Sequence, residues 1–271
     1  MSVRPRKSLG QHFLTDRALL AKIAAATGAG PGDVVLEIGP GPGGLTAALL
    51  ERGATVVAIE RDDRMRENLV HRFAGTPFLL ATGDALELDW PSLVAPWTAA
   101  GKRWIVAGNI PYNITSPLIA KALMPSLPES VTFLVQREVA ERIAAEPGTP
   151  EYGALTVGVQ AVATVLLGVL VKKGAFAPPP KVDSTVITLI PRSPPLVGHD
   201  QIPAFRRLVT SLFSYRRKRM VRALREATGM DADQATTLLQ SAAIDPDVRP
   251  EAVSVQQFVQ LLAAMEPPRL P

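Results

Sequence analysis

Cysteine is absent from this 271-residue chain, and histidine occurs only as His12, His71 and His199. The lack of cysteine excludes disulfides and thiolate chemistry and is typical of a cytoplasmic protein. Three scattered histidines do not have the spacing of a metal site, so we expect no metal. No apolar run is long enough to span a membrane, and the basic residues 1–7 lack the apolar segment of a secretory signal. We therefore expect a soluble cytoplasmic protein without a membrane partner.

The positive charge of the chain is concentrated in one segment. The net charge of +4 is a weak sign of a polyanionic partner, but Ala204 to Arg225 contains eight Arg or Lys and no Asp or Glu. This distribution favours a nucleic-acid contact. A charge run on a solvated helix face is the alternative.

Apolar runs alternate with turn residues up to Ile190. We predict buried strands at Val34–Ile38, 54–60, 78–81, 103–108, 130–136 and 185–190, with one more inside 158–171. Helices are expected after a cap at Thr15 or Asp16, from Gly44, and near 63–73, 116–124 and 137–145. This β-α alternation, ending in a hairpin-like pair, predicts an α/β domain with a mostly parallel sheet between helices.

Strand-like patterns stop after Ile190, and Pro191–Pro195 is typical of a linker. Helical patterns then occupy 202–214, 216–228, 231–241 and 254–265. We therefore expect two domains, an α/β domain over 1–191 and a small all-helical domain over 192–271.

A glycine loop joins the first predicted strand to a helix. Gly39, Gly41 and Gly43 would let the backbone approach a ligand closely. The spacing Gly39-x-Gly41-x-x-Gly44 also fits the dinucleotide fingerprint, and Glu60 suits a ribose-hydroxyl acceptor in either case. The loop predicts a nucleoside-containing cofactor but does not exclude NAD or a purely structural turn.

Asp84 follows the third strand, where a carboxylate can accept a hydrogen bond from an adenine amino group. A turn or cap is the alternative for an isolated aspartate. Its register with Gly41, Glu60 and Asn109 favours binding, because the carboxyl ends of parallel strands meet at one edge of a sheet.

The stretch Asn109-Ile110-Pro111-Tyr112 follows the strand at 103–108. Pro111 cannot continue a central strand, so the strand should end near Asn109. An amide oxygen and a free carbonyl accept hydrogen bonds, and a tyrosine ring offers a stacking platform. Together they would suit a planar exocyclic amine. An ordinary strand end followed by a turn is the alternative.

Taken together, these motifs resemble the KsgA family of ribosomal RNA adenine dimethyltransferases, which use S-adenosylmethionine. The resemblance covers nearly the whole chain, and Ile110 and His12 stand where leucine and asparagine are usual. It rests on the ordered set Gln11-His12-Phe13-Leu14, Glu37-Ile38-Gly39-Pro40-Gly41, Glu60, Gly83-Asp84, Asn109-Ile110-Pro111-Tyr112, Gln136-Arg137-Glu138-Val139-Ala140-Glu141-Arg142 and Phe176-Pro178-Pro179-Lys181-Val182-Ser184.

The resemblance implies a Rossmann-like class I methyltransferase sheet with a small all-helical C-terminal domain. It implies that His12 and Leu14 close over S-adenosylmethionine and that Gly39 and Gly41 admit its methionine part. Glu60 would hold the ribose hydroxyls, and Asp84 would hold the adenine amino group.

The implied product is N6,N6-dimethyladenosine at two adjacent adenosines near the 3′ end of small-subunit (16S) rRNA, within an assembling 30S-type particle. Asn109 and the Ile110 carbonyl would accept from the target amine, while Tyr112 and Phe176 would sandwich the extruded base. Packing of Phe176 into the core is the alternative. We expect a monomer.

The basic segment is the expected RNA contact, because an arginine fork bonds phosphate in bidentate fashion. We expect a helical face whose RNA-contacting residues are Arg216, Arg217, Lys218, Arg219 and Arg222. Three other functions stay open: a NAD-dependent dehydrogenase, a large-subunit rRNA adenine methyltransferase of the macrolide-resistance type, and an assembly factor with dispensable catalysis.

Overall fold

The protein is described by a computed structural model that covers residue 6 and residues 11–265. Apart from Arg6, the basic segment 1–7 lies outside the described residues. Backbone contacts divide the chain into two compact units. The first comprises the described residues of Met1–Ala140 and Val165–Pro191, and the second those of Glu141–Thr164 and Arg192–Pro271. One junction falls at the predicted boundary after residue 191, but residues 141–164 group with the helical unit because α7 packs on α8.

Regular elements follow one another in alternation over the first part of the chain. The strands of the described residues are β1 (Phe13–Leu14), β2 (Val34–Ile38), β3 (Thr55–Glu60), β4 (Phe78–Thr82), β5 (Trp104–Asn109), β6 (Val131–Gln136), β7 (Ala163–Val171), β8 (Phe176–Ala177) and β9 (Ser184–Pro191). The helices there are α1 (Arg17–Ala26), α2 (Gly44–Glu51), α3 (Asp63–Arg72), α4 (Trp90–Thr98), α5 (Thr115–Ala122), α6 (Arg137–Ala144), α7 (Ala154–Gln160), α8 (Ile202–Ser214), α9 (Met220–Thr228), α10 (Ala232–Ser241) and α11 (Val255–Ala264). Short 3₁₀ turns are η2 (Tyr112–Ile114), η3 (Lys173–Ala175) and η4 (Pro250–Ala252).

The main sheet has seven strands within the described residues, in the order β4-β3-β2-β5-β6-β9-β7, and β1 pairs separately with β8. β2 lies parallel to both β3 and β5, whereas β9 lies antiparallel to β6. The prediction of a mostly parallel sheet is therefore confirmed. Because the chain leaves β2 for β3 on one side and returns to β5 on the other, the strand order reverses between β2 and β5. Open α/β sheets bind ligands at such a point.

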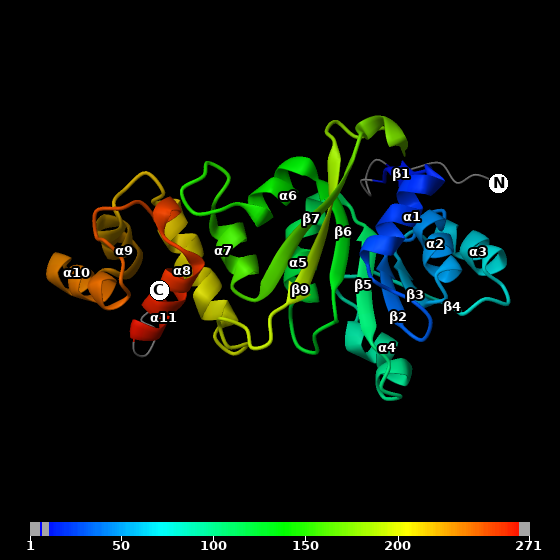
Figure 1. The fold of residues 1–271 in the computed structure, drawn as a ribbon, viewed down its shortest axis with the longest axis horizontal. Helices are drawn as coiled ribbons and strands as arrows, with labels where there is room; N and C mark the ends of the chain where they lie inside the picture. The colour runs from blue at the N-terminus through cyan, green and yellow to red at the C-terminus, as the bar shows by residue number, and fades with distance from the viewer. Residues whose placement is uncertain (1–5, 7–10, 266–271) are drawn as a thin grey trace. The chain divides into compact units, whose positions relative to one another are not determined.

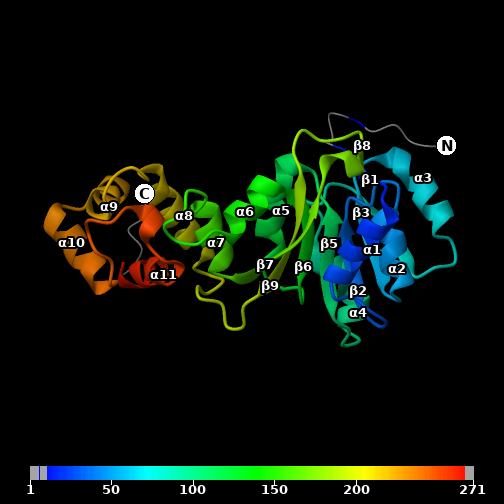
Figure 2. The same ribbon diagram turned by 45° about the horizontal axis from the view of Figure 1, so that its top comes forward.

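Both faces of the central strands are buried, which explains why they are almost continuously apolar. Val35, Val56 and Ile105 join the core under α1 and α2, which lie side by side (Figures 1 and 2). The alternate residues Leu36 and Val57 point to the opposite face and are also buried, where α4 packs on β2 and β5. The sheet is thus held rigidly beneath its strand ends.

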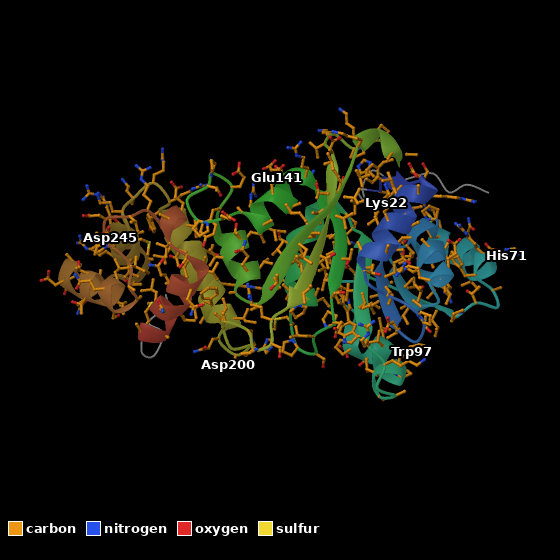
Figure 3. The ribbon with its side chains drawn as sticks, in the orientation of Figure 1. Lys22, His71, Trp97, Glu141, Asp200 and Asp245 are labelled. Atoms are coloured by element: carbon orange, nitrogen blue, oxygen red, sulfur yellow. The ribbon has the colours of Figure 1, made fainter. Side chains whose placement is uncertain are left out.

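Two helices, α4 and α7, were not predicted from the sequence. Pro96 argues against a helix at 90–98, whereas Pro91 lies in the first turn, where proline is tolerated. Trp90 is nevertheless buried, and its indole Nε1 donates to the Ala85 carbonyl oxygen at 2.8 Å. Packing thus overrides propensity in α4, where Trp97 is labelled in Figure 3. α7 precedes β7 in an apolar stretch, and a short apolar run does not distinguish a helix from a strand by periodicity.

The second unit has its own aromatic core. The buried Tyr152 hydroxyl donates to the Val253 carbonyl at 2.9 Å, and the Phe213 ring lies 6.1 Å from that of Tyr152 and 5.8 Å from that of Phe258. No helix among the described residues combines the length and apolar character needed to cross a bilayer.

Candidate functional site

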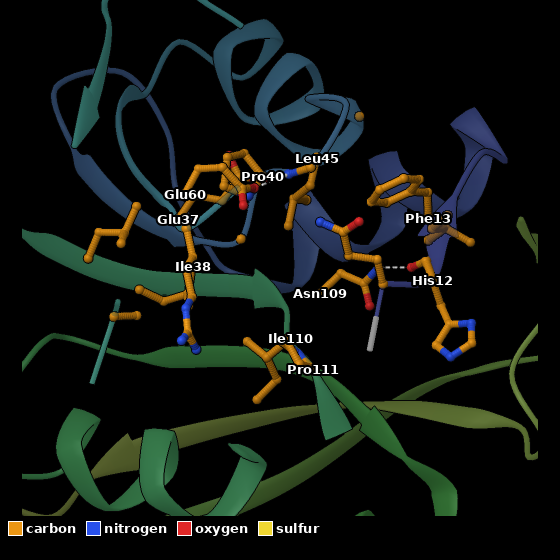
Figure 4. Close-up of a pocket in the computed structure, with 18 of the residues that line it drawn as sticks. His12, Phe13, Glu37, Ile38, Pro40, Leu45, Glu60, Asn109, Ile110 and Pro111 are labelled. Carbon is orange, nitrogen blue, oxygen red and sulfur yellow. Dashed lines mark hydrogen bonds between the residues drawn. The ribbon is translucent and has the colours of Figure 1, made fainter. Parts of the chain in front are cut away.

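The strand-end pocket lies where β2, β3, β4 and β5 end. Figure 4 shows Glu37 and Glu60 at one end of the view and His12 and Phe13 at the other, with Asn109 between them. This arrangement places groups from four strand ends around one cavity. The residues lining the pocket are Gln11, His12, Phe13, Leu14, Leu20, Ile23, Glu37, Ile38, Gly39, Pro40, Gly41, Pro42, Gly44, Leu45, Ile59, Glu60, Arg61, Gly83, Asp84, Ala85, Asn109, Ile110, Pro111, Tyr112, Asn113 and Ile114.

The glycine loop after β2 needs its glycines for two reasons. Gly39, Gly41 and Gly43 have φ of +69°, +54° and +82°, a region that side-chain-bearing residues rarely adopt. A Cβ on Gly41 would also lie 3.0 Å from the Phe13 ring, whereas one on Gly39 would meet no atom within 4 Å. The loop therefore brings bare backbone to the cavity, as a ligand in close approach requires.

Glu60 ends β3 with its carboxylate held by backbone donors. One oxygen accepts from the Gly41 N–H at 3.1 Å and the other from the Asp62 N–H at 2.8 Å. Burial raises the pKa of Glu60, and the neighbouring Asp62 charge adds to the rise. Since a carboxylate oxygen has two lone pairs, Glu60 retains acceptor capacity for hydroxyl donors in the pocket.

Asp62 links the N-terminal segment to this carboxylate. It caps α3, pairs with Arg64, and accepts from the Gln11 side-chain nitrogen at 3.1 Å. The hydrogen bonds from Arg64 first, and then that from Gln11, lower the pKa of Asp62 to about 2. These residues were not predicted as site residues from the sequence. The sequence signal that could have identified them is the cluster of charged residues directly after the strand that ends at Glu60.

Glu37 is a second pocket residue that was not predicted as a site residue. It is fully buried in β2, and its carboxylate accepts from the Thr46 hydroxyl at 2.6 Å. Burial raises its pKa to about 7, and the nearby Glu60 charge contributes. A lone acid within the buried strand Val34–Ile38 was the signal that could have identified it, because an acid is rarely buried without a role.

Asp84 has the turn role that the sequence left open as an alternative, and its predicted adenine contact stays a prediction. One oxygen accepts from the Leu86 N–H at 2.9 Å, which is the turn role, and the other pairs with Arg61 at 3.0 Å. Asp84 also lines the cavity. The Arg61 side chain is 65% exposed, so this ion pair stands at the edge of the cavity.

Asn109 is the last residue of β5, where the strand ends as predicted. Its Nδ2 donates to the His12 carbonyl oxygen at 2.9 Å (Figure 4). Because a carbonyl can only accept, this contact assigns Nδ2 to the His12 side and turns Oδ1 away from it. Gly108 permits the close approach of β5 to β2, since a Cβ there would lie 2.6 Å from the Ile38 carbonyl oxygen.

Pro111 and Tyr112 follow directly. Pro111 has φ −60° and ψ 133°, and Tyr112 begins η2. The Tyr112 hydroxyl lies 2.6 Å from Ser184 Oγ, and its ring stacks on the His12 ring with centroids 6.0 Å apart. Burial raises the pKa of Tyr112, so its phenol stays protonated at neutral pH.

His12 and Leu14 both line the cavity, but Phe176 does not. β1 and β8 pair so that Leu14 lies opposite Phe176, and both side chains join the core cluster. Phe176 is only 4% exposed. In this structure Phe176 therefore packs in the core, which is the alternative that the sequence left open, because strand pairing with β1 turns the ring inward. Its stacking on the base stays a prediction. His12 lies beside Tyr112 instead, and the Pro178 carbonyl accepts from its Nδ1 at 2.8 Å.

The basic residues expected to contact RNA are not on one helix. Residues 215–219 form a turn between α8 and α9, here called the basic turn, so only Arg222 of the five lies in a helix. Arg216 Nε lies 2.5 Å from Glu251 and its Nη2 donates to the Pro150 carbonyl. Arg219 pairs with Asp247 at 2.8 Å. The predicted helix began too early, because helical periodicity continues through the turn.

No group of three or more His, Cys, Asp or Glu side chains suited to a metal ion occurs among the residues that the structure describes. The polar side chains that line the strand-end pocket, beside apolar ones, are three carboxylates, three amides, one imidazole, one guanidinium and one phenol: Glu37, Glu60, Asp84, Gln11, Asn109, Asn113, His12, Arg61 and Tyr112. The carboxylate and amide oxygens in this set can accept hydrogen bonds from ribose hydroxyls and from an adenine amino group.

The sheet order and the strand-end pocket define a Rossmann-like fold, and its similarity to two solved methyltransferases places the protein in the class of Rossmann-like methyltransferases. A crystal structure of a dimethyladenosine transferase from Plasmodium falciparum is similar, with 27% identity, a TM-score of 0.81 and coverage of 96% of this chain and 99% of that one. One of the 23S rRNA methyltransferase ErmE has 26% identity, a TM-score of 0.71 and coverage of 94% and 99%.

Residues 3–266 match the family described as Ribosomal RNA adenine dimethylase, and the chain belongs to that family. The Ribosomal RNA small subunit methyltransferase A of Geobacter sulfurreducens is 40% identical to it, over 96% of this chain and 94% of that relative. Membership of this family confirms the predicted resemblance and sets aside the dehydrogenase alternative.

Proposed function

We propose that this protein dimethylates N6 of two adjacent adenosines near the 3′ end of small-subunit (16S) rRNA, using S-adenosylmethionine. The observation that carries the proposal is the orientation of Asn109 at the end of β5, with its nitrogen on the His12 carbonyl and its oxygen turned away. The relative at 40% identity over nearly the full length, named for the small subunit, supports the choice of substrate.

The pocket residues fit the proposed cofactor. The Glu60 carboxylate can still accept hydrogen bonds from the two ribose hydroxyls, and the Asp84 carboxylate can still accept one from the adenine amino group. Gly39 and Gly41 present backbone without a side chain, and apolar residues such as Ile59 and Ala85 border the cavity. His12 and Leu14 would close the N-terminal side. When bound, S-adenosylmethionine supplies a methyl group activated by its sulfonium.

Asn109 and Ile110 then act on the target amine. The lone pair of an adenine amino group is delocalised into the ring, which makes the nitrogen a poor nucleophile. The Asn109 side-chain oxygen and the Ile110 carbonyl accept from its two N–H groups and localise that lone pair as the nitrogen becomes tetrahedral. Because Pro111 and the His12 contact hold these acceptors beforehand, they stabilise the transition state most. The methylated nitrogen releases its proton to water.

Tyr112 supplies the stacking surface for the base, which must leave its helix or stack to reach the pocket. Stacking on an aromatic ring contributes about 1–3 kcal/mol. A sandwich with Phe176 would require the β1–β8 pair to move, since that ring is buried with Leu14. We retain Phe176 as a second platform under that condition.

RNA contact is proposed for the basic turn and the start of α9, through Arg216, Arg217, Lys218, Arg219 and Arg222. Arg217 and Lys218 are exposed and form no ion pair within the described residues, so their charges are available to phosphate. The substrate would be an assembling small-subunit particle in the cytoplasm, and the enzyme would act as a monomer with the two domains predicted from the sequence.

The deciding experiment incubates the protein with S-adenosylmethionine and small subunits that lack the modification, followed by mass spectrometry of the 3′-terminal rRNA fragment. Two dimethylated adenosines are expected. Large subunits assayed in parallel test the alternative that similarity to ErmE raises. Methylation of the large-subunit rRNA alone, or of neither particle, would overturn the proposal.

A further inference from the structure

The Tyr112 hydroxyl has a buried partner outside the catalytic motif. It lies 2.6 Å from the Oγ of Ser184, which is fully buried at the first position of β9. Ser184 is paired with Gln136 of β6, so its backbone belongs to the rigid part of the sheet. The contact therefore ties a 3₁₀ turn at the pocket to a strand 72 residues later in the chain.

The Tyr112 ring is restrained at two places. Ser184 holds the hydroxyl at its tip, and the His12 ring stacks beside it with an interplanar angle of 20°. The Pro178 carbonyl in turn holds His12 through its Nδ1. A ring restrained in this way loses less conformational freedom when a base stacks on it, so more of the stacking energy is available to the reaction.

We propose that Ser184 is a positioning residue for methyl transfer, holding the Tyr112 ring in the orientation that receives the extruded adenine. This inference rests on the proposed function of Tyr112 as a stacking platform. The simpler alternative is that the hydrogen bond only fastens η2 to β9 and contributes to stability. The two differ in what happens to kcat.

The test compares Ser184→Ala and Tyr112→Phe with the wild-type protein, using small subunits that lack the modification. Each variant should lose roughly tenfold in kcat, as expected for one hydrogen bond acting in the transition state. The KM for the particle and the Kd for S-adenosylmethionine should not change. The double variant should lose no more than either single variant, because both changes remove the same bond.

Thr188→Val is the matched control. It removes a hydroxyl from the same strand, where Thr188 and Thr132 form a similar pair at 3.1 Å away from the lining of the pocket. This variant should lower the Tm as Ser184→Ala does, while kcat remains that of the wild-type protein.

Three outcomes would each overturn the inference. The first is a wild-type kcat in Ser184→Ala, the second is an equal loss of kcat in Thr188→Val, and the third is an additive loss of kcat in the double variant. If Ser184→Ala does not fold, the kcat of the double variant is compared with that of the wild-type protein instead, since the double variant leaves no buried hydroxyl without its partner. A wild-type protein inactive on these particles would instead count against the proposed function. An active wild-type protein with an unaffected Ser184→Ala counts against this inference alone.

Discussion

The strand-end pocket and the basic turn hold their charges in opposite ways. In the pocket, Glu37 and Glu60 are buried, and hydroxyl or backbone donors contact their carboxylates. In the basic turn, Arg219 and its partner Asp247 are each 69% exposed. Burial fixes geometry and shifts pKa values, whereas exposure leaves a charge screened by salt but able to attract a distant polyanion. These properties suit the pocket to the proposed methyl transfer and the basic turn to the proposed contact with RNA.

The largest effect is expected from Asn109→Ala, which removes a preformed acceptor from the pocket. Methyl transfer should fall by roughly 10²–10³-fold, the usual cost of losing one such group. RNA affinity should be retained, because the basic turn is unchanged. Single-turnover assays with labelled S-adenosylmethionine and a filter-binding assay measure the two properties. Full methylation by this variant would contradict the proposed mechanism. Loss of RNA binding would contradict the assignment of methyl transfer to the pocket and of RNA binding to the basic turn.

A second prediction concerns the basic turn. Replacing Arg217 and Lys218 together by serine should weaken binding to small-subunit RNA and reduce the slope of log affinity against log salt by roughly 0.7–0.9 for each phosphate that is no longer neutralised. Binding of S-adenosylmethionine should not change. Arg216→Ser is the comparison, because Arg216 also holds Glu251 and the Pro150 carbonyl, and its replacement should lower the Tm as well. An unchanged salt slope in the double variant would exclude the turn as a phosphate-binding surface.

The third prediction uses the raised pKa of Glu37, about 7 in the folded protein against an ordinary value of 4.5. The folded state binds the proton more tightly than the unfolded state, so this contribution to stability is complete below about pH 4.5 and is lost as the pH rises through about 7. The loss should be on the order of 3 kcal/mol.

Urea midpoints measured between pH 5 and pH 8 should fall in the wild-type protein and fall less in Glu37→Gln. The raised pKa of Glu60 leaves a residual slope of the same sign. Identical pH profiles for the two proteins would show that Glu37 does not titrate in this range.

The smallest effect is expected at Phe176. Phe176→Leu keeps an apolar side chain in the core beside Leu14 but removes the aromatic ring. If the ring only packs in the core, the variant should keep the wild-type kcat. Its free energy of unfolding should fall by about 1 kcal/mol, which lowers the Tm modestly. If instead the β1–β8 pair moves and the ring stacks on the base, kcat should fall, and the Tm should again be only modestly lower than that of the wild-type protein. Phe176→Ala serves as the control for reduced packing.

Predictions from the sequence were correct where local signals were strong. The apolar strands predicted at 34–38 and 103–108, the glycine loop and Pro111 each restrict the backbone on their own, so β2, its loop and the end of β5 near Asn109 were predicted correctly. The prediction failed at α4, where Pro96 argued against a helix that packing on the sheet stabilises. It also failed at the basic turn, because the helical periodicity of 216–228 does not reveal that α9 begins only at Met220.

The strands of the main sheet, the four strand-end groups and the family could be read from the chain alone, because they depend on residue types at fixed spacings. Which side chains meet became known only from the folded molecule. Strand pairing buried Phe176 and placed His12 beside Tyr112, and the position of β9 in the sheet brought Ser184 to the Tyr112 hydroxyl. Contacts between residues far apart in the chain depend on register and packing, and no local pattern encodes them.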